Sequence, residues 1–173
     1  MSAGDAAAGA GAAARGPRIL RDSMTAFRIG DAHGAWPIWS EGGAQTTDGR
    51  WHEAGARAIY ASEHFSTALL EKLVHYSGEL PPNQHFIDIH IPAGTSYEVV
   101  TPDALPGWAA ADGMAARAFG RRWFEEGRSA VLIVPSVAAR MERNLVFNAA
   151  HPGFAAIRPG LETPVRWDAR LFD

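Results

Sequence analysis

The chain has no cysteine among its 173 residues, which excludes a disulfide framework, a thiolate metal site and a cysteine nucleophile. Lysine is almost as scarce, because Lys72 is the single lysine and the other basic residues are all arginine. Arginine offers rigid, planar hydrogen-bond donors that suit phosphate groups. The formal net charge of −3 does not favour nucleic acid, so we expect no direct contact with DNA or RNA.

Long apolar runs are also missing, since no stretch of about 18 hydrophobic residues occurs, and we expect no membrane span. Residues 1–17 are rich in Ala and Gly. They carry Asp5 near the start and glycines that interrupt the alanines, unlike a secretory signal. From this pattern we predict a disordered tail over 1–17, one folded domain over 18–173 and a cytoplasmic protein.

The rest of the chain predicts many short strands and two helices. We expect one helix over 63–76, with Ser62 as its N-cap and an apolar stripe of Phe65, Leu69, Leu73 and Tyr76, and a second over 112–126. Strands are expected over 25–30, 57–61, 85–91, 97–100, 129–134, 144–148 and 164–170, with a long ordered loop over 31–56. This inventory indicates the α+β class, with a compact mixed-sheet core.

Several catalytic motifs do not occur. The string at His52 reads HEAGA rather than H-E-x-x-H, and the seven histidines lack paired metal-ligand spacing, so we expect no metal site. The patterns G-x-S-x-G and G-x-x-x-x-G-K-[ST] are also missing. A nuclease would have to use scattered His, Glu and Arg without a basic stripe, and this hypothesis stays a minor alternative.

Four residues stand where their chemistry suits a functional site. Arg28, inside a strand, either grips a diphosphate or forms an ion pair that faces water. Tyr60 ends a strand where a helix begins, so its ring either stacks on an aromatic heterocycle or packs in the core. Glu71 lies mid-helix among apolar neighbours, as a partnered carboxylate or as an exposed residue beside Lys72. Ser136 follows the most apolar strand, as a functional hydroxyl or a turn serine.

The order of the short motifs around these residues resembles a known family. The motifs are F-R-I at 27–29, G-R-W at 49–51, I-Y-A-S at 59–62, A-L-L-E-K-L-V-H at 68–75, L-P-G-W at 105–108, V-P-S at 134–136, E-R-N at 142–144 and H-P at 151–152. In this order they resemble the RES domain, the toxin half of RES–Xre toxin–antitoxin modules, and among its members the ParT type. The likeness covers about residues 24–158. It departs at His52, where many relatives have Asn, and at 148–150, where this chain reads N-A-A and many relatives have N-P before the His-Pro.

The resemblance implies a core similar to diphtheria-toxin-like ADP-ribosyltransferases, with NAD⁺ as the substrate. The Arg, Glu and Ser that name the domain correspond to Arg28, Glu71 and Ser136. We assign Glu71 to the ribose, where its carboxylate stabilises the positive charge that develops as nicotinamide leaves. Arg28 would hold the diphosphate with Arg50 as a second clamp, Tyr60 would stack on nicotinamide, and Ser136 would orient the nicotinamide amide or Glu71. This chemistry requires no metal.

The resemblance also implies partners. One is a cognate Xre-type helix-turn-helix antitoxin that blocks the active-site entrance. Another is a protein that accepts ADP-ribose, for which phosphoribosyl pyrophosphate synthetase is the candidate. The main alternative is transfer to phosphate or water, by an NAD⁺ phosphorylase or glycohydrolase that depletes NAD⁺. A module that binds a nucleotide without cleaving it is a further alternative, and the roles of His52 and His75 are open.

Overall fold

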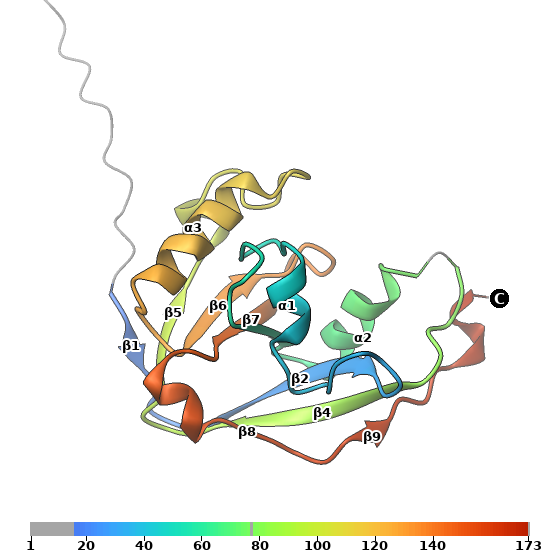
Figure 1. Cartoon of the computed structure of the whole chain (residues 1–173). Coiled ribbons are helices and arrows are strands. Elements are labelled where there is room, and N and C mark those ends of the chain that lie inside the picture. The colour runs from blue at the N-terminus through green and yellow to red at the C-terminus, as the bar shows by residue number, and fades with distance from the viewer. Residues whose placement is uncertain (1–15, 77, 173) are drawn as a thin grey trace, which may run out of the picture.

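A nine-stranded mixed sheet organises the chain, of which the computed structural model describes residues 16–76 and 78–172 (Figure 1). The strand order is β1-β5-β6-β7-β3-β2-β4-β8, and β9 also pairs with β4. The strands are β1 (Arg18–Ile19), β2 (Met24–Asp31), β3 (Ala58–Ser62), β4 (Gln84–Ile91), β5 (Ser96–Val99), β6 (Val131–Pro135), β7 (Arg143–Asn148), β8 (Arg158–Pro159) and β9 (Thr163–Pro164). The tail expected over 1–17 lies outside the described residues, apart from Gly16 and Pro17.

The helices connect and cover this sheet. They are α1 (Gly42–Thr46), α2 (Phe65–Leu73) and α3 (Met114–Glu125), with the 3₁₀ turns η1 (Pro102–Ala104), η2 (Pro152–Ala156) and η3 (Ala169–Phe172). The pair β5 and β6 is parallel, which requires a crossover connection, and α3 supplies it. In Figure 1 β2 and β4 lie almost flat while β5 and β6 rise steeply, so the sheet is strongly bent and α1 lies inside the bend. The predicted α+β class is confirmed.

Alternation along the strands divides the core between the two faces of the sheet. On β6, Val131 and Ile133 join one buried cluster, while Leu132 and Val134 join the other. β6 lies between β5 and β7, which explains why its sequence is apolar on both faces, and the strand expected over 129–134 is confirmed. The alternating isoleucines of β4 all point into the first cluster, as their spacing predicts.

Helix α2 begins later than the pattern over 63–76 predicts, and Ser62 is not its N-cap. Strand β3 continues as far as Ser62, which pairs with Asn144 of β7, and the Ser62 hydroxyl donates to Oδ1 of Asn144 at 2.7 Å. The residue before the helix is His64, whose side chain makes no capping hydrogen bond. Ser62, which the local sequence predicts to be the helix N-cap, is therefore part of the sheet instead.

The expected apolar stripe of α2 is only partly used. Phe65 packs against Phe27 and Phe86, with ring centroids 5.8 and 4.8 Å apart. The buried residues of the helix are instead Thr67 and Ala68. Because these small side chains let the helix approach the sheet closely, the neighbouring face of α2 is brought to the ends of β3 and β7.

The strand expected over 164–170 is wrong except at its start. Within this segment only Pro164 belongs to a strand, β9, which pairs with β4. The indole N–H of Trp167 donates to the carbonyl of Pro81 at 3.1 Å. Asp168 accepts a hydrogen bond from the backbone N–H of Arg170 at 3.0 Å, which begins the final 3₁₀ turn.

Within the described residues, no helix is long and apolar enough to cross a membrane.

The packing of α3 on the loop before β3 requires a glycine. Gly120 is buried, and a Cβ added there would overlap the backbone carbonyl of Trp51, which cannot move aside like a flexible side chain. Trp51 is itself only 2% exposed and lies in the second core cluster. The close approach of Gly120 thus holds the loop that carries Trp51 against the helix.

We predict that Gly120→Ala lowers the free energy of unfolding by about 2 kcal/mol or more, because the overlap outweighs the better helix propensity of alanine. Gly43→Ala is the matched control, since Gly43 is also helical and an added Cβ would meet nothing within 4 Å. Urea unfolding of the two variants and the parent measures the effect. Equal stability of Gly120→Ala and the parent would contradict the packing argument.

Candidate active site

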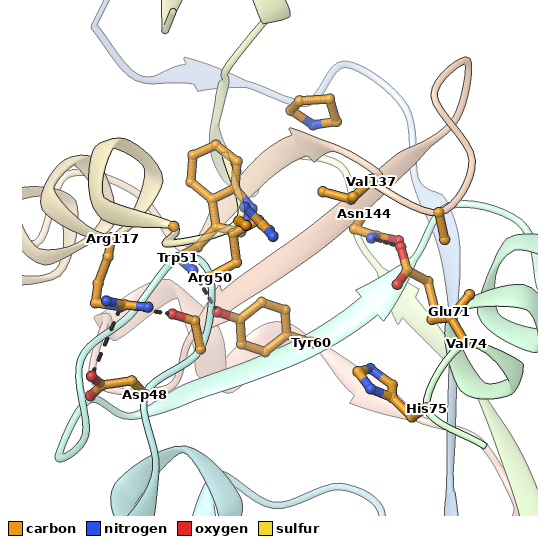
Figure 2. A pocket seen from close by; sticks show the side chains of 15 residues that line it. Asp48, Arg50, Trp51, Tyr60, Glu71, Val74, His75, Arg117, Val137 and Asn144 are labelled. Carbon is orange, nitrogen blue, oxygen red and sulfur yellow. Dashed lines mark hydrogen bonds and ion pairs between the residues drawn. The ribbon is translucent and has the colours of Figure 1, made fainter. Parts of the chain in front are cut away.

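Two cavities meet between α2, β3 and the start of β7. The larger has a volume of about 600 Å³ and the smaller of about 250 Å³. Both are lined by the same four residues, namely Tyr60, Glu71, His75 and Asn144. Figure 2 shows the larger cavity, with the Glu71 carboxylate on one wall and the Tyr60 ring facing it across the space.

The Glu71 carboxylate is held by two donors, one directly after β6 and one on β7. The Ser136 hydroxyl donates to Oε1 of Glu71 at 2.7 Å, and the Nδ2 amide of Asn144 donates to the same oxygen at 2.6 Å. The amide of Asn144 is oriented in turn by the hydroxyl of Ser62. No described residue forms a hydrogen bond with Oε2 of Glu71. The network fixes the carboxylate and leaves one oxygen available.

Ser136 itself is completely buried and lines neither cavity. Its hydroxyl accepts a hydrogen bond from the backbone N–H of Ala139 at 2.9 Å while it donates to Glu71. The residue is therefore both the turn serine and the carboxylate partner that the sequence left as alternatives. Its geometry suits the orientation of Glu71, rather than direct contact with a ligand.

Arg28 lies on β2, and its side chain lines the smaller cavity together with Glu71. Its Nε donates to the carbonyl of Ile38 at 2.6 Å, and its Nη1 donates to the carbonyl of Tyr60 at 2.7 Å. Burial lowers the pKa of Arg28 to about 10, which leaves the guanidinium charged at neutral pH. Arg28 is thus anchored to backbone, rather than paired with a surface carboxylate.

Tyr60 is fixed through its hydroxyl. That oxygen accepts a hydrogen bond from the backbone N–H of Trp51 at 3.1 Å and lies 2.7 Å from Nδ1 of His52. His52 Nε2 lies 3.1 Å from the carbonyl of Thr47, which can only accept, so Nε2 carries the proton and Nδ1 accepts from Tyr60. Burial, the largest cause, lowers the pKa of His52, consistent with this neutral imidazole, and burial raises the pKa of Tyr60.

The turn that contains the G-R-W motif is shaped by this contact. A Cβ on Gly49 would overlap the imidazole of His52 and come within 2.9 Å of the Tyr60 hydroxyl oxygen, so only glycine fits there. The next residue, Arg50, points into the larger cavity, and its Nη1 donates to the carbonyls of Trp108 and Ala110 at 3.1 and 2.8 Å. The turn thereby delivers one cation to the cavity wall.

Arg117 of α3 is a second cation on the same wall, and nothing in the sequence singled it out. Its Nε donates to the carbonyl of Gly49 at 3.2 Å and lies 4.0 Å from a carboxylate oxygen of Asp48 (Figure 2). Arg50 and Arg117 therefore line the larger cavity, whereas Arg28 lines the smaller one. The predicted pair of clamps, Arg28 and Arg50, is divided between two cavities.

The structure brings together all five residues that the sequence singled out. Arg28, Tyr60, Glu71 and Arg50 line the two cavities, and Ser136 contacts Glu71 from behind. Asn144 is added as the second partner of Glu71. It appeared in the sequence only as part of the E-R-N motif, and its role depends on the pairing of β3 with β7. In the described part of the chain, no group of three or more His, Asp or Glu could hold a metal ion.

The fold and the site define a known class of protein. The family model of the RES domain matches residues 25–168, and the chain belongs to this family. The resemblance inferred from the motif order is thereby confirmed, and the match includes Arg28, Glu71 and Ser136.

Relatives and a solved structure are similar over most of their lengths. "Prs ADP-ribosylating toxin" of Sphingobium sp. (strain YBL2) is 40% identical over 159 residues, which are 89% of this chain and 94% of that protein. "Toxin Res" of Photorhabdus laumondii subsp. laumondii is 33% identical over 128 residues, which are 72% of this chain and 81% of that protein. A chain of the M. tuberculosis MbcT–MbcA toxin–antitoxin complex has a TM-score of 0.67 at 18% identity, covering 84% of this chain and 85% of that chain, and shares the fold.

The neutral, buried state of His52 predicts a pH dependence of stability. Its pKa in the folded protein lies below the ordinary value of 6.5, so the unfolded chain takes up a proton first as the pH falls. The contribution of His52 is complete above pH 6.5 and should be lost as the pH drops toward the lower folded pKa. His52→Asn, which does not titrate, should show a shallower loss of unfolding free energy in urea below pH 6.5.

The matched control is His33→Asn, because His33 is exposed. This variant should follow the parent at each pH. If His52→Asn and the parent lose stability with the same slope, His52 is not the neutral acceptor of the Tyr60 hydroxyl.

Proposed function

We propose that this protein is the toxin of a toxin–antitoxin pair, which cleaves NAD⁺ at the nicotinamide–ribose bond and transfers ADP-ribose to a protein. The observation that carries the proposal is the position of Glu71. Its carboxylate stands where two cavities meet, with one oxygen held by Ser136 and Asn144 and the other without a described partner. Membership of the RES family supports the proposal, as does the 40% identity to a relative named for ADP-ribosylation.

The shape and lining of the site suit a dinucleotide. Small-molecule sites commonly enclose about 300–1,000 Å³, and the larger cavity alone falls in this range. Cations stand in both cavities, with Arg28 in the smaller one and Arg50 in the larger. A flat ring, Tyr60, lies at the junction and is immobilised by its hydroxyl. These groups match the diphosphate and the heterocycles of NAD⁺.

The chemistry follows from the leaving group. Nicotinamide departs from NAD⁺ as a neutral molecule, and the barrier lies in the positive charge that develops on the ribose. A fixed carboxylate beside the ribose stabilises that charge without reorganising at the moment of reaction. Glu71 supplies the carboxylate, and Ser136 and Asn144 hold it in position. Tyr60 offers its ring as a stacking surface for nicotinamide.

The proposal also names the acceptor of ADP-ribose and the partner protein. We propose a protein acceptor, with phosphoribosyl pyrophosphate synthetase as the candidate, because a 40% identical relative is named a Prs ADP-ribosylating toxin. We propose an Xre-type helix-turn-helix antitoxin as the partner, which closes the cleft near Arg28, Arg50 and Tyr60. The shared fold with a chain of a toxin–antitoxin complex supports the presence of an antitoxin.

Removal of the carboxylate should abolish most cleavage. Glu71→Ala should fold and release nicotinamide from NAD⁺ about 10²–10³ times more slowly than the parent, the usual cost of a lost transition-state partner. Chromatography of nicotinamide and ADP-ribose products measures the rate. Glu125→Gln is the control, since Glu125 is an exposed carboxylate on α3 outside both cavities. Cleavage by Glu71→Ala at the parent rate would refute the assignment.

The acceptor is tested with NAD⁺ labelled in its ADP-ribose part and purified phosphoribosyl pyrophosphate synthetase. Label should appear on the synthetase band with the parent protein and not with Glu71→Ala, and omission of phosphate should leave nicotinamide release unchanged. Release that stops without phosphate, with no labelled protein, would identify an NAD⁺ phosphorylase instead. Release into water without labelled protein would identify a glycohydrolase, and tight binding without release would identify a nucleotide-binding module.

A further inference from the structure

Lys72, the only lysine of the chain, stands in the smaller cavity beside Arg28. The side chain is half-buried, and it makes no hydrogen bond or ion pair with another residue that the structure describes. It follows Glu71 on α2, so the carboxylate and the ammonium line the same cavity from one helix. The free-energy cost of removing this ammonium from water is therefore not offset by a partner in the described structure.

The groups that face Lys72 do not neutralise it. They are Arg28 and Asp31 of β2, Tyr60 of β3, and Glu71 and His75 of α2 and the turn after it. Burial and the neighbouring charge of Arg28 lower the pKa of Lys72, and the opposing effect of Asp31 is smaller. Two cations thus share a cavity of about 250 Å³.

Arg28 still has donors to offer. Its Nε and one hydrogen of Nη1 are used by the carbonyls of Ile38 and Tyr60, while Nη2 makes no hydrogen bond to a described residue. The arginine therefore presents its free end to the cavity in a fixed orientation. Lys72 presents three rotatable donors on a flexible stem. Together they offer donors for two phosphate groups.

We propose that Arg28 and Lys72 form a diphosphate subsite, in which Lys72 is a binding residue. The smaller cavity is below the usual volume of a whole ligand site, about 300 Å³, so it suits one part of a ligand whose remainder occupies the larger cavity. Within the proposed function, on which this step rests, that part is the diphosphate of NAD⁺. The repulsion between the two cations is then relieved only when the anion binds.

The first experiment measures binding of inorganic pyrophosphate by calorimetry at about pH 7.5, above the ordinary histidine range. Lys72→Met should weaken binding about tenfold or more, because a charge-assisted hydrogen bond is lost. Lys72→Arg, which keeps the charge, should stay within a few-fold of the parent. Arg122→Met, which removes an exposed charge outside both cavities, should have no effect. Equal binding by Lys72→Met and the parent would overturn the proposal.

The pH dependence supplies an independent readout. As the pH rises toward the ordinary lysine value of 10.5, pyrophosphate binding by the parent should weaken, because the lowered pKa of Lys72 lets the ammonium lose its proton earlier than an exposed lysine. Lys72→Arg should weaken less, since its guanidinium keeps the charge. Arg28 is present in both proteins, so its own titration cancels in the comparison. Identical profiles for the two proteins would contradict a role for the Lys72 charge.

The stability of the unliganded protein separates a binding role from a structural one. Lys72→Met removes the repulsion with Arg28, so its melting temperature without ligand should equal or exceed that of the parent. A binding residue is expected to cost stability in this way. A melting temperature several degrees below that of the parent would show that Lys72 supports the fold, and would overturn the assignment.

A final arm distinguishes a dinucleotide from a free phosphate compound. In the Glu71→Ala background, which prevents turnover, Lys72→Met should weaken NAD⁺ binding as much as it weakens pyrophosphate binding, and pyrophosphate should compete with NAD⁺. Unchanged NAD⁺ affinity would overturn the assignment to the dinucleotide. If the parent protein releases no nicotinamide while both anions bind through Lys72, the proposed activity fails and the diphosphate subsite stands.

Discussion

The two hydrogen bonds that Oε1 of Glu71 accepts join helix α2 to parts of the chain 65 and 73 residues later, and the rest of the site is arranged around them. Ser136 follows β6, Asn144 is the second residue of β7, and Glu71 lies on α2, so the carboxylate is positioned by the packing of the helix on the sheet. The small residues Thr67 and Ala68 allow this approach. A carboxylate held by two fixed donors is preorganised, which makes it suited to stabilise a developing positive charge.

Around the negatively charged Glu71, four cationic side chains line the two cavities, namely Arg28, Lys72, Arg50 and Arg117. Arg28 and Arg50 are tied to backbone carbonyls and not to surface carboxylates, while Arg117 donates to a carbonyl and also lies 4.0 Å from Asp48. Hydrogen bonds to carbonyls orient a guanidinium but leave its charge available. A site of this kind is stabilised by an anionic ligand, and the folded protein bears the cost of the repulsion until the ligand arrives.

The sequence predicted best where a pattern repeats over several residues. The alternating isoleucines of β4 and the apolar run of β6 located two strands, and the order of the short motifs located the family. It was wrong where a tertiary contact competes with a local preference. Ser62 has the chemistry of an N-cap, yet its hydroxyl binds Asn144 because β3 extends along β7. The strand expected over 164–170 ends early because Asp168 begins a 3₁₀ turn.

Residue chemistry along the chain determined which side chains are candidates for the proposed dinucleotide site, since guanidinium, carboxylate, phenol and hydroxyl groups have properties that do not depend on the fold. Tertiary structure alone decided the remaining features of the site. It divides these groups between two cavities, adds Asn144 and Arg117 to them, and places Lys72 in the same cavity as Arg28. The reason is physical. A side chain acts over a few ångströms, and which groups come within that distance depends on strand register and helix packing, which a linear order does not contain.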